Sequence, residues 1–133
     1  MSNNTHTTLL NSQLQADNNA QQLTVEFFYR GRRYPVNVAK LPFMIGRDAS
    51  SCDLLIDGPM ISRHHCSVEI RDGQLGILDR STNGTMVKLG RVDSVFVRNE
   101  FCPLVGQGYM KLGEALNLDD PQLLMFKVAL REA

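Results

Sequence analysis

Short runs of β-forming residues alternate with turn signals from residue 23 onward, and this alternation constrains the fold more than any other feature. Asp72-Gly73 and Asn83-Gly84, which separate some of the runs, are dipeptides typical of tight hairpins. We find no convincing amphipathic helix. Many short strands at regular spacing are typical of a sandwich, so we predict an all-β, antiparallel β-sandwich of about 10–11 strands. The expected strands are 23–29, 34–40, 42–46, 53–56, 66–70, 74–79, 85–89, 92–97, 109–112 and 123–130.

The first 22 residues have a different composition from the rest of the chain. They are rich in Asn, Gln, Thr and Ser, and they contain one acidic side chain and no aromatic one. Such a segment cannot bury enough apolar surface to offset the entropy lost on ordering. We therefore predict a flexible polar tail at residues 1–22 and one domain at residues 23–133, a length that suits a single core.

The charge and cysteine content exclude several classes of protein. The chain has 14 basic and 14 acidic side chains, which argues against binding to nucleic acid or membranes by bulk charge. Basic residues outnumber acidic ones by 11 to 8 within residues 26–98, so an anion site is expected there. Three cysteines without tight spacing, no secretory signal and no long apolar stretch predict a cytoplasmic protein.

Three expected loops contain polar residues suited to binding a phosphate group. They are 46–48, 62–65 and 79–85. An arginine guanidinium presents a planar fork of donors that matches phosphate oxygens. Serine and threonine hydroxyls and loop N–H groups can fill the remaining acceptor positions. These loops predict a phosphate-binding site that needs no metal and no cofactor.

The order and spacing of these residues resemble the signature of the forkhead-associated (FHA) domain. The matching elements are Gly46-Arg47, Ser62-Arg63-x-His65 and Asp79-x-Ser81-Thr82-Asn83-Gly84-Thr85. The resemblance implies a sandwich that binds phosphothreonine peptides through loops at one end. It implies that Arg47 and Ser62 contact the phosphate and that Arg63 assists. It also implies that Thr82 lines the binding surface and that Asn83 holds the peptide main chain.

The same resemblance assigns supporting roles to three further residues. Gly46 and His65 are expected to support the loops, and Gly84 to allow the tight turn after Asn83. Met60, two residues before Ser62, suggests an apolar contact to a downstream peptide residue. The chain lacks the Gly-Asp pair usual after residues 85–91, so we expect the strand order to survive with an altered loop around residues 98–108.

The predicted function is therefore a non-catalytic module that recognises phosphothreonine on partner proteins in Ser/Thr kinase signalling. The alternative is a phosphate-independent interaction or dimerisation module of the same fold. A kinase acting on Thr5, Thr7 or Thr8 would create a ligand for this module or for a second copy, so intramolecular tail binding and a homodimer remain open.

Two other readings of the segment 62–66 are weaker. His64, His65, Cys66 and Cys52 lack the spacing of a zinc site, because adjacent strand residues point to opposite faces. Ser62, His65 and Asp79 could form a hydrolase triad, but no nucleophile-elbow motif is present.

Overall fold

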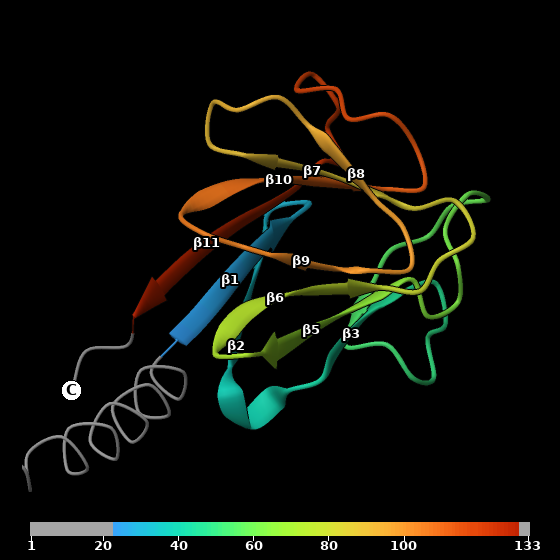
Figure 1. Ribbon diagram of the computed structural model, residues 1–133. Helices are drawn as coiled ribbons and strands as arrows, with labels where there is room; N and C mark the ends of the chain where they lie inside the picture. The colour runs from blue at the N-terminus through green and yellow to red at the C-terminus, as the bar shows by residue number, and fades with distance from the viewer. Residues whose placement is uncertain (1–22, 131–133) are drawn as a thin grey trace, which may run out of the picture.

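The computed structural model describes residues 23–130, which contain eleven strands and one short 3₁₀ helix (Figure 1). The first sheet has the strand order β2-β1-β11-β10-β7-β8, and the second has the order β4-β3-β5-β6-β9. The elements are β1 (Leu23–Tyr29), β2 (Arg32–Asn37), η1 (Val38–Lys40), β3 (Phe43–Gly46), β4 (Leu54–Leu55), β5 (Cys66–Arg71), β6 (Gln74–Asp79), β7 (Thr85–Leu89), β8 (Val95–Val97), β9 (Phe101–Pro103), β10 (Gln107–Leu112) and β11 (Leu124–Leu130).

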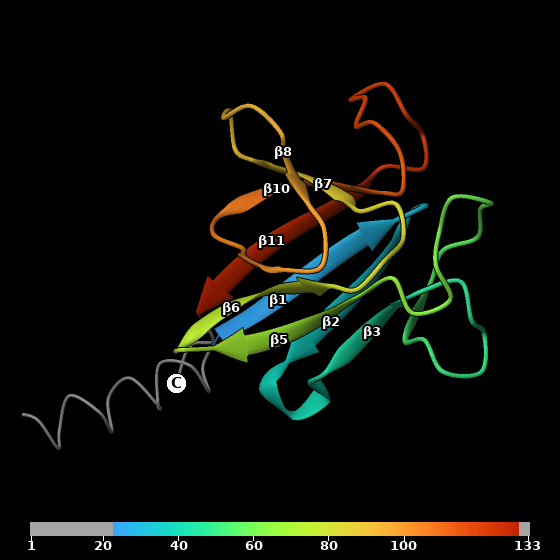
Figure 2. The same cartoon turned by 45° about the vertical axis from the view of Figure 1, so that its right-hand side comes forward.

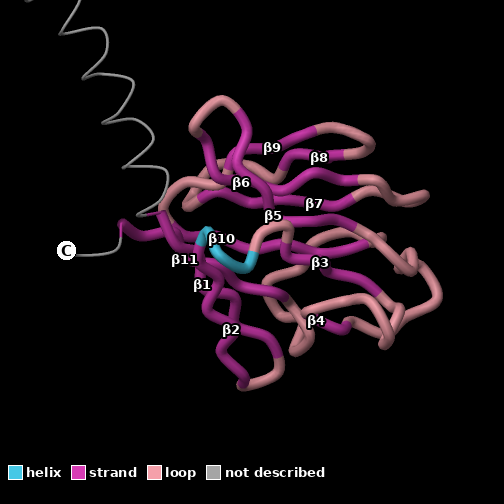
Figure 3. Tube along the Cα trace, turned by 90° about the horizontal axis from the view of Figure 1, so that it is seen from below, coloured by secondary structure: helices cyan, strands magenta, loops and turns pink. Residues whose placement is uncertain are grey.

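The two sheets pack face to face, which confirms the predicted β-sandwich (Figures 2 and 3). Every strand pair is antiparallel except β3 with β4, which is parallel. Within the described residues the only helix is three residues long, and no helix there could span a membrane.

The core lies between the sheets and follows from the alternation of side chains along each strand. Val25, Phe27 and Tyr29 of β1 are buried, whereas the residues between them are only partly covered. The rings of Phe27 and Phe43, one from each sheet, are stacked with centroids 6.1 Å apart. A pair of this kind adds about 0.5–1.5 kcal/mol beyond the burial of its area.

Three predictions about the strands differ from the structure. The strand expected at 34–40 ends at Asn37, because the Asn37 side chain accepts the N–H of Ala39 and starts η1. The segment 98–108, expected as a loop, contains β9 and the start of β10. β9 pairs with β6, far away in the sequence, so the local pattern around this three-residue strand carries little information. The expected strand at 92–97 is shortened to β8.

The loops 47–53, 56–65 and 80–84 lie together at one end of the sandwich, which we call the loop end; in Figure 1 it is on the right. The opposite end, which we call the hairpin end, carries the turns 72–73, 90–94 and 104–106. β1 begins and β11 ends at the hairpin end. The three segments that were predicted to bind phosphate therefore share one end of the molecule.

A candidate phosphate-binding site at the loop end

Arg47 is placed by its backbone, which runs beside residues 62–63. Its N–H donates to the carbonyls of Ser62 and Arg63, both at 3.1 Å. The chain can approach so closely because residue 46 is glycine. A Cβ added at Gly46 would overlap the carbonyl oxygen of Arg63.

The guanidinium of Arg47 is oriented by one hydrogen bond that leaves its outer face open. Nε donates to the carbonyl of Ile61 at 2.9 Å. The two Nη groups make no hydrogen bond or ion pair within residues 23–130, and the residue is exposed. The side chain therefore presents a fixed pair of donors to solvent, which is the geometry that binds a phosphate or carboxylate.

Ser62 lies next to Arg47 and keeps one donor free. Its hydroxyl oxygen accepts the backbone N–H of Thr82 at 3.1 Å, so the β4–β5 and β6–β7 loops are joined at this atom. A hydroxyl that accepts in this way still has its own proton to donate. Ser62 is half-buried, and within residues 23–130 its hydroxyl proton has no acceptor.

His65 is fully buried and connects the two loops from beneath. Its Nδ1 accepts the N–H of Ser62 at 3.1 Å, and its Nε2 lies 2.8 Å from the carbonyl of Gly84. Because Nδ1 is the acceptor, the neutral ring carries its proton on Nε2 and donates it to Gly84. Burial lowers the pKa of His65, which keeps the ring in this neutral form.

Asn83 is held in the same way as Arg47, through a carbonyl of the β4–β5 loop. Its Nδ2 donates to the carbonyl of Met60 at 3.0 Å, which leaves Oδ1 to accept an N–H from a ligand. The side chain of Thr82, one residue earlier, is exposed. Gly84 follows with a φ of 83°, a conformation that favours glycine.

Asp79 fixes the shape of the β6–β7 loop, a role that the sequence did not assign to it. The buried carboxylate accepts the N–H and hydroxyl of Ser81, the hydroxyl of Thr85 and the N–H of Asn99, at distances of 2.6–3.1 Å. Ser81 in turn accepts the N–H of Gly84 at 2.7 Å. An aspartate followed two residues later by serine is typical of such a turn, so the signal was present in the motif.

Arg63 differs from Arg47 in having an acidic neighbour. Its Nη2 lies 3.4 Å from Asp48 Oδ2, and its side chain is 71% exposed. Hydrogen bonds from Ser51 and Ser50, with the charge of Arg63, hold the pKa of Asp48 well below its usual range. Part of the Arg63 charge is therefore balanced by Asp48, whereas Arg47 has no ion-pair partner among residues 23–130.

His64 points to the outside of the loop end. Its Nε2 contacts the hydroxyl of Ser51 and lies 3.5 Å from Asp48 Oδ2, so it links the β3–β4 loop to the β4–β5 loop. His65, by contrast, uses both ring nitrogens on backbone groups, and neither is free to act on the Ser62 hydroxyl. Within residues 23–130 no group of three or more His, Cys, Asp or Glu is placed to hold a metal ion.

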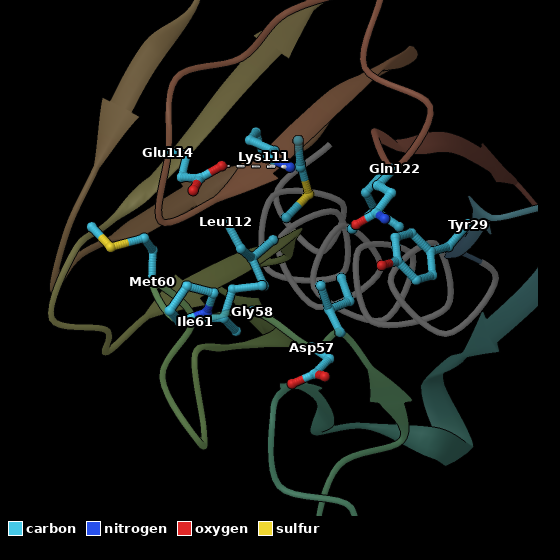
Figure 4. A pocket seen from close by; sticks show the side chains of 13 residues that line it. Tyr29, Asp57, Gly58, Met60, Ile61, Lys111, Leu112, Glu114 and Gln122 are labelled. Atoms are coloured by element: carbon cyan, nitrogen blue, oxygen red, sulfur yellow. Dashed lines mark ion pairs between the residues drawn. The ribbon is translucent and has the colours of Figure 1, made fainter.

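A separate pocket of about 190 Å³ is lined by residues 56–61 together with residues of β10 and β11, and Arg47 is not part of its lining (Figure 4). Its lining includes the apolar residues Ile56, Ile61, Met110, Leu112 and Leu124. Lys111 at its edge pairs with Asp120 at 2.7 Å and Glu114 at 3.9 Å. Met60 also lines this pocket, and its side chain is 41% exposed (Figure 4).

The structure thus brings together every residue that the sequence proposed for ligand contact. Arg47, Ser62, Thr82 and Asn83 are linked through shared backbone partners, and Arg63 lies beside them. Gly46, His65 and Gly84 lie beneath these side chains as close-packed or hydrogen-bonded positions.

The comparisons with known proteins agree with the described fold. A family model described as the FHA domain matches residues 43–101. The FHA-1 domain of Mycobacterium tuberculosis Rv1747 is similar in structure, with 24% identity and a TM-score of 0.57 over 80% of this chain and 97% of that one. No curated protein sequence matches the chain.

Two further similar structures are FHA domains in complex with phosphothreonine peptides. The MEK1 FHA domain, bound to a HOP1 peptide, has 19% identity and a TM-score of 0.58 over 78% of this chain and 95% of that one. The N-terminal FHA domain of S. cerevisiae Rad53p has 16% identity and a TM-score of 0.53 over 81% and 94%. The FHA family model thus matches residues 43–101, and the described residues share the fold of these FHA domains.

Proposed function

We propose that the protein is a non-catalytic reader of phosphothreonine on partner proteins in Ser/Thr kinase signalling. The observation that carries the proposal is that three hydrogen-bonding groups without a partner among residues 23–130 lie together at the loop end. They are the Nη groups of Arg47, the hydroxyl proton of Ser62 and Oδ1 of Asn83. The first two suit a phosphate and the third suits a peptide N–H.

The strength of such contacts is adequate for a signalling interaction. A phosphothreonine carries a charge of about −1.5 to −2 near pH 7. Each hydrogen bond to a charged group contributes roughly 1.5–3 kcal/mol, so two or three of them, less the cost of association, give a Kd on the order of micromolar. Arg47 and Ser62 are already held in place by other hydrogen bonds, so little conformational entropy is lost on binding.

The remaining assignments follow from this proposal. The domain is taken as residues 23–133 and the segment 1–22, which lies outside the described residues, as its tail. The three cysteines are free thiols, which fits the proposed cytoplasmic location. The partner is a phosphothreonine-containing protein or peptide, and two structural neighbours have such peptides bound.

The test compares one peptide in its phosphothreonine, phosphoserine and unmodified forms by isothermal titration calorimetry. We expect only phosphorylated forms to bind and Arg47→Ala to weaken binding at least about 100-fold, because two charged hydrogen bonds are lost. Arg47→Lys keeps the charge and loses the fork, so it should restore only part of the affinity. Arg91→Ala at the hairpin end is the control and should have no effect.

Binding that ignores the phosphate, or that is unchanged in Arg47→Ala, would contradict the proposal. It would favour a phosphate-independent interaction or dimerisation module of the same fold. Sedimentation velocity on the unliganded protein then separates these two, because only dimerisation changes the mass of the free protein with concentration.

A further inference from the structure

β8, the last strand of the first sheet, exposes a large aromatic side chain close to the proposed peptide site. Phe96 is 55% exposed and pairs in register with Met86 of β7. Their neighbours Val87 and Val97 are buried, so Phe96 and Met86 lie on the outer face of the sheet. An isolated exposed apolar residue needs no explanation, but this one is in contact with the binding loops.

The ring of Phe96 packs directly on the turn that follows Asn83. A Cβ added at Gly84 would overlap ring carbons Cε1 and Cζ of Phe96. The N–H of Gly113, at the end of β10, donates to the carbonyl of Gly84 at 2.8 Å. Phe96, Gly84 and Gly113 therefore form one continuous surface.

This surface is concave and mostly apolar. Asn83, Gly84, Met86, Phe96, Gly113 and Ala115 line a hollow of about 310 Å³. Glu114 is the one charged residue in its lining, and its carboxylate lies 3.9 Å from Lys111. Ligand pockets have volumes of roughly 300–1,000 Å³, so a hollow at the lower limit suits a single large side chain rather than the face of a protein.

We propose that Phe96 and Met86 form a subsite for a large apolar or aromatic side chain of the phosphopeptide. The inference rests on the proposed function and extends it to the class of ligand. Asn83 belongs to both surfaces: in the proposed function its Oδ1 accepts an N–H of the peptide main chain, and the residue also lines the hollow. A peptide held at Asn83 therefore has a residue beside Phe96, and this continuity identifies the peptide as the occupant.

The expected gain in affinity is about tenfold for the preferred side chain over alanine. Burial of a large apolar side chain is worth more than this when it is complete, but the hollow is open on one side. Aromatic, Leu and Met side chains should be favoured, and Asp and Glu disfavoured because Glu114 lies at the edge.

The test is a set of phosphothreonine peptides in which each flanking position is changed in turn to Phe, Leu, Ala or Asp. The wild-type protein should prefer Phe or Leu at one position by about tenfold over Ala. Phe96→Ser should abolish that preference, with a larger loss of affinity for the Phe and Leu peptides than for the alanine peptide. Val92→Ser, an exposed apolar residue of the neighbouring turn that does not line the hollow, is the matched control and should behave as wild type.

Phe96→Leu provides a second variant that keeps an apolar surface, and it should retain part of the preference even if Phe96→Ser folds poorly. A preference that survives in Phe96→Ser, equal losses for all peptides, or no preference in the wild type would overturn the subsite while the proposed function stands. A loss of self-association in Phe96→Ser without a change in peptide preference would assign Phe96 to contact with a second copy and would also overturn it. Absence of any phosphate dependence would overturn both proposals.

Discussion

The turns at the two ends of the sandwich have opposite designs. At the hairpin end, Gly73, Gly90 and Gly106 adopt left-handed backbone conformations, and a Cβ added at any of them would meet no other atom within 4 Å. At the loop end, Gly46 and Gly84 are tightly covered, and buried polar side chains fix the chain on both sides of them. A hairpin turn requires only a suitable φ, whereas the loop end requires that several segments keep one arrangement.

This difference explains how loops without regular secondary structure can hold donor groups in fixed positions. His65 and Asp79 supply hydrogen bonds from within the core, so the loops are ordered before a ligand arrives. A preorganised site avoids part of the ordering cost of binding. The comparison predicts that the same substitution will have unequal effects at the two ends.

The largest difference is expected for aspartate-to-asparagine changes. Asp79→Asn replaces one acceptor oxygen by an amide donor that faces other donors, which should lower the free energy of unfolding by about 2–4 kcal/mol. Asp72→Asn at the hairpin end should change it by less than about 0.5 kcal/mol, because asparagine also adopts the left-handed conformation found there. Urea unfolding of the two variants measures both values, and equal losses would contradict the comparison.

A smaller difference is expected for glycine-to-alanine changes. Gly46→Ala forces apart two backbone segments, with an expected loss of about 2–3 kcal/mol and weaker phosphopeptide binding through displacement of Arg47. Gly90→Ala meets no steric obstacle and should cost only about 1 kcal/mol for its left-handed φ. Thermal unfolding together with calorimetric titration tests this prediction; unchanged peptide affinity in Gly46→Ala would show that the position of Arg47 does not depend on this contact.

The smallest effect is the pH dependence that His65 gives to the loop end. Its pKa is lowered by burial, so below about pH 6.5 the unfolded chain binds a proton that the folded protein does not. Stability should therefore fall as the pH drops below 6.5, by at most about 1.4 kcal/mol per pH unit.

Urea unfolding of the free protein between pH 7 and pH 5 measures this slope. His64→Asn, which removes the exposed neighbouring histidine, should keep the slope, whereas His65→Asn should reduce it as well as lower stability. A slope that disappears in His64→Asn and persists in His65→Asn would reverse the assignment. The effect of Asp48 lies in a separate window below pH 4, because its lowered pKa makes stability fall only there.

The sequence predicted the fold class and most strands because their side-chain alternation is local. The ranges 23–29, 74–79 and 85–89 agree with β1, β6 and β7 to the residue. β9 could not be found in this way, because Phe101–Pro103 is short, contains proline and depends on pairing with β6. The strand expected at 34–40 ends at Asn37 because the backbone N–H of Ala39 donates to the Asn37 side chain. This hydrogen bond replaces one that would continue the pairing of β2 with β1.

The candidate site could be predicted as a set of side chains but not as a geometry. The motif supplied Arg47, Ser62 and Asn83, yet the groups that orient them include backbone carbonyls, whose positions no side-chain pattern encodes. The proposed role of Phe96 in peptide binding could not be predicted from the sequence either. The sequence does not show that this exposed aromatic residue of an edge strand packs against Gly84.

The carbonyls of Met60 and Ile61 have one more consequence. The carbonyl oxygen of Met60 accepts from Asn83 and that of Ile61 accepts from Arg47. One short segment of the β4–β5 loop therefore orients both side chains. Every amino acid supplies a carbonyl, and mutation of residue 60 leaves this acceptor intact. The exposed side chain at position 60 can therefore vary without loosening the hydrogen bonds that orient Asn83 and Arg47.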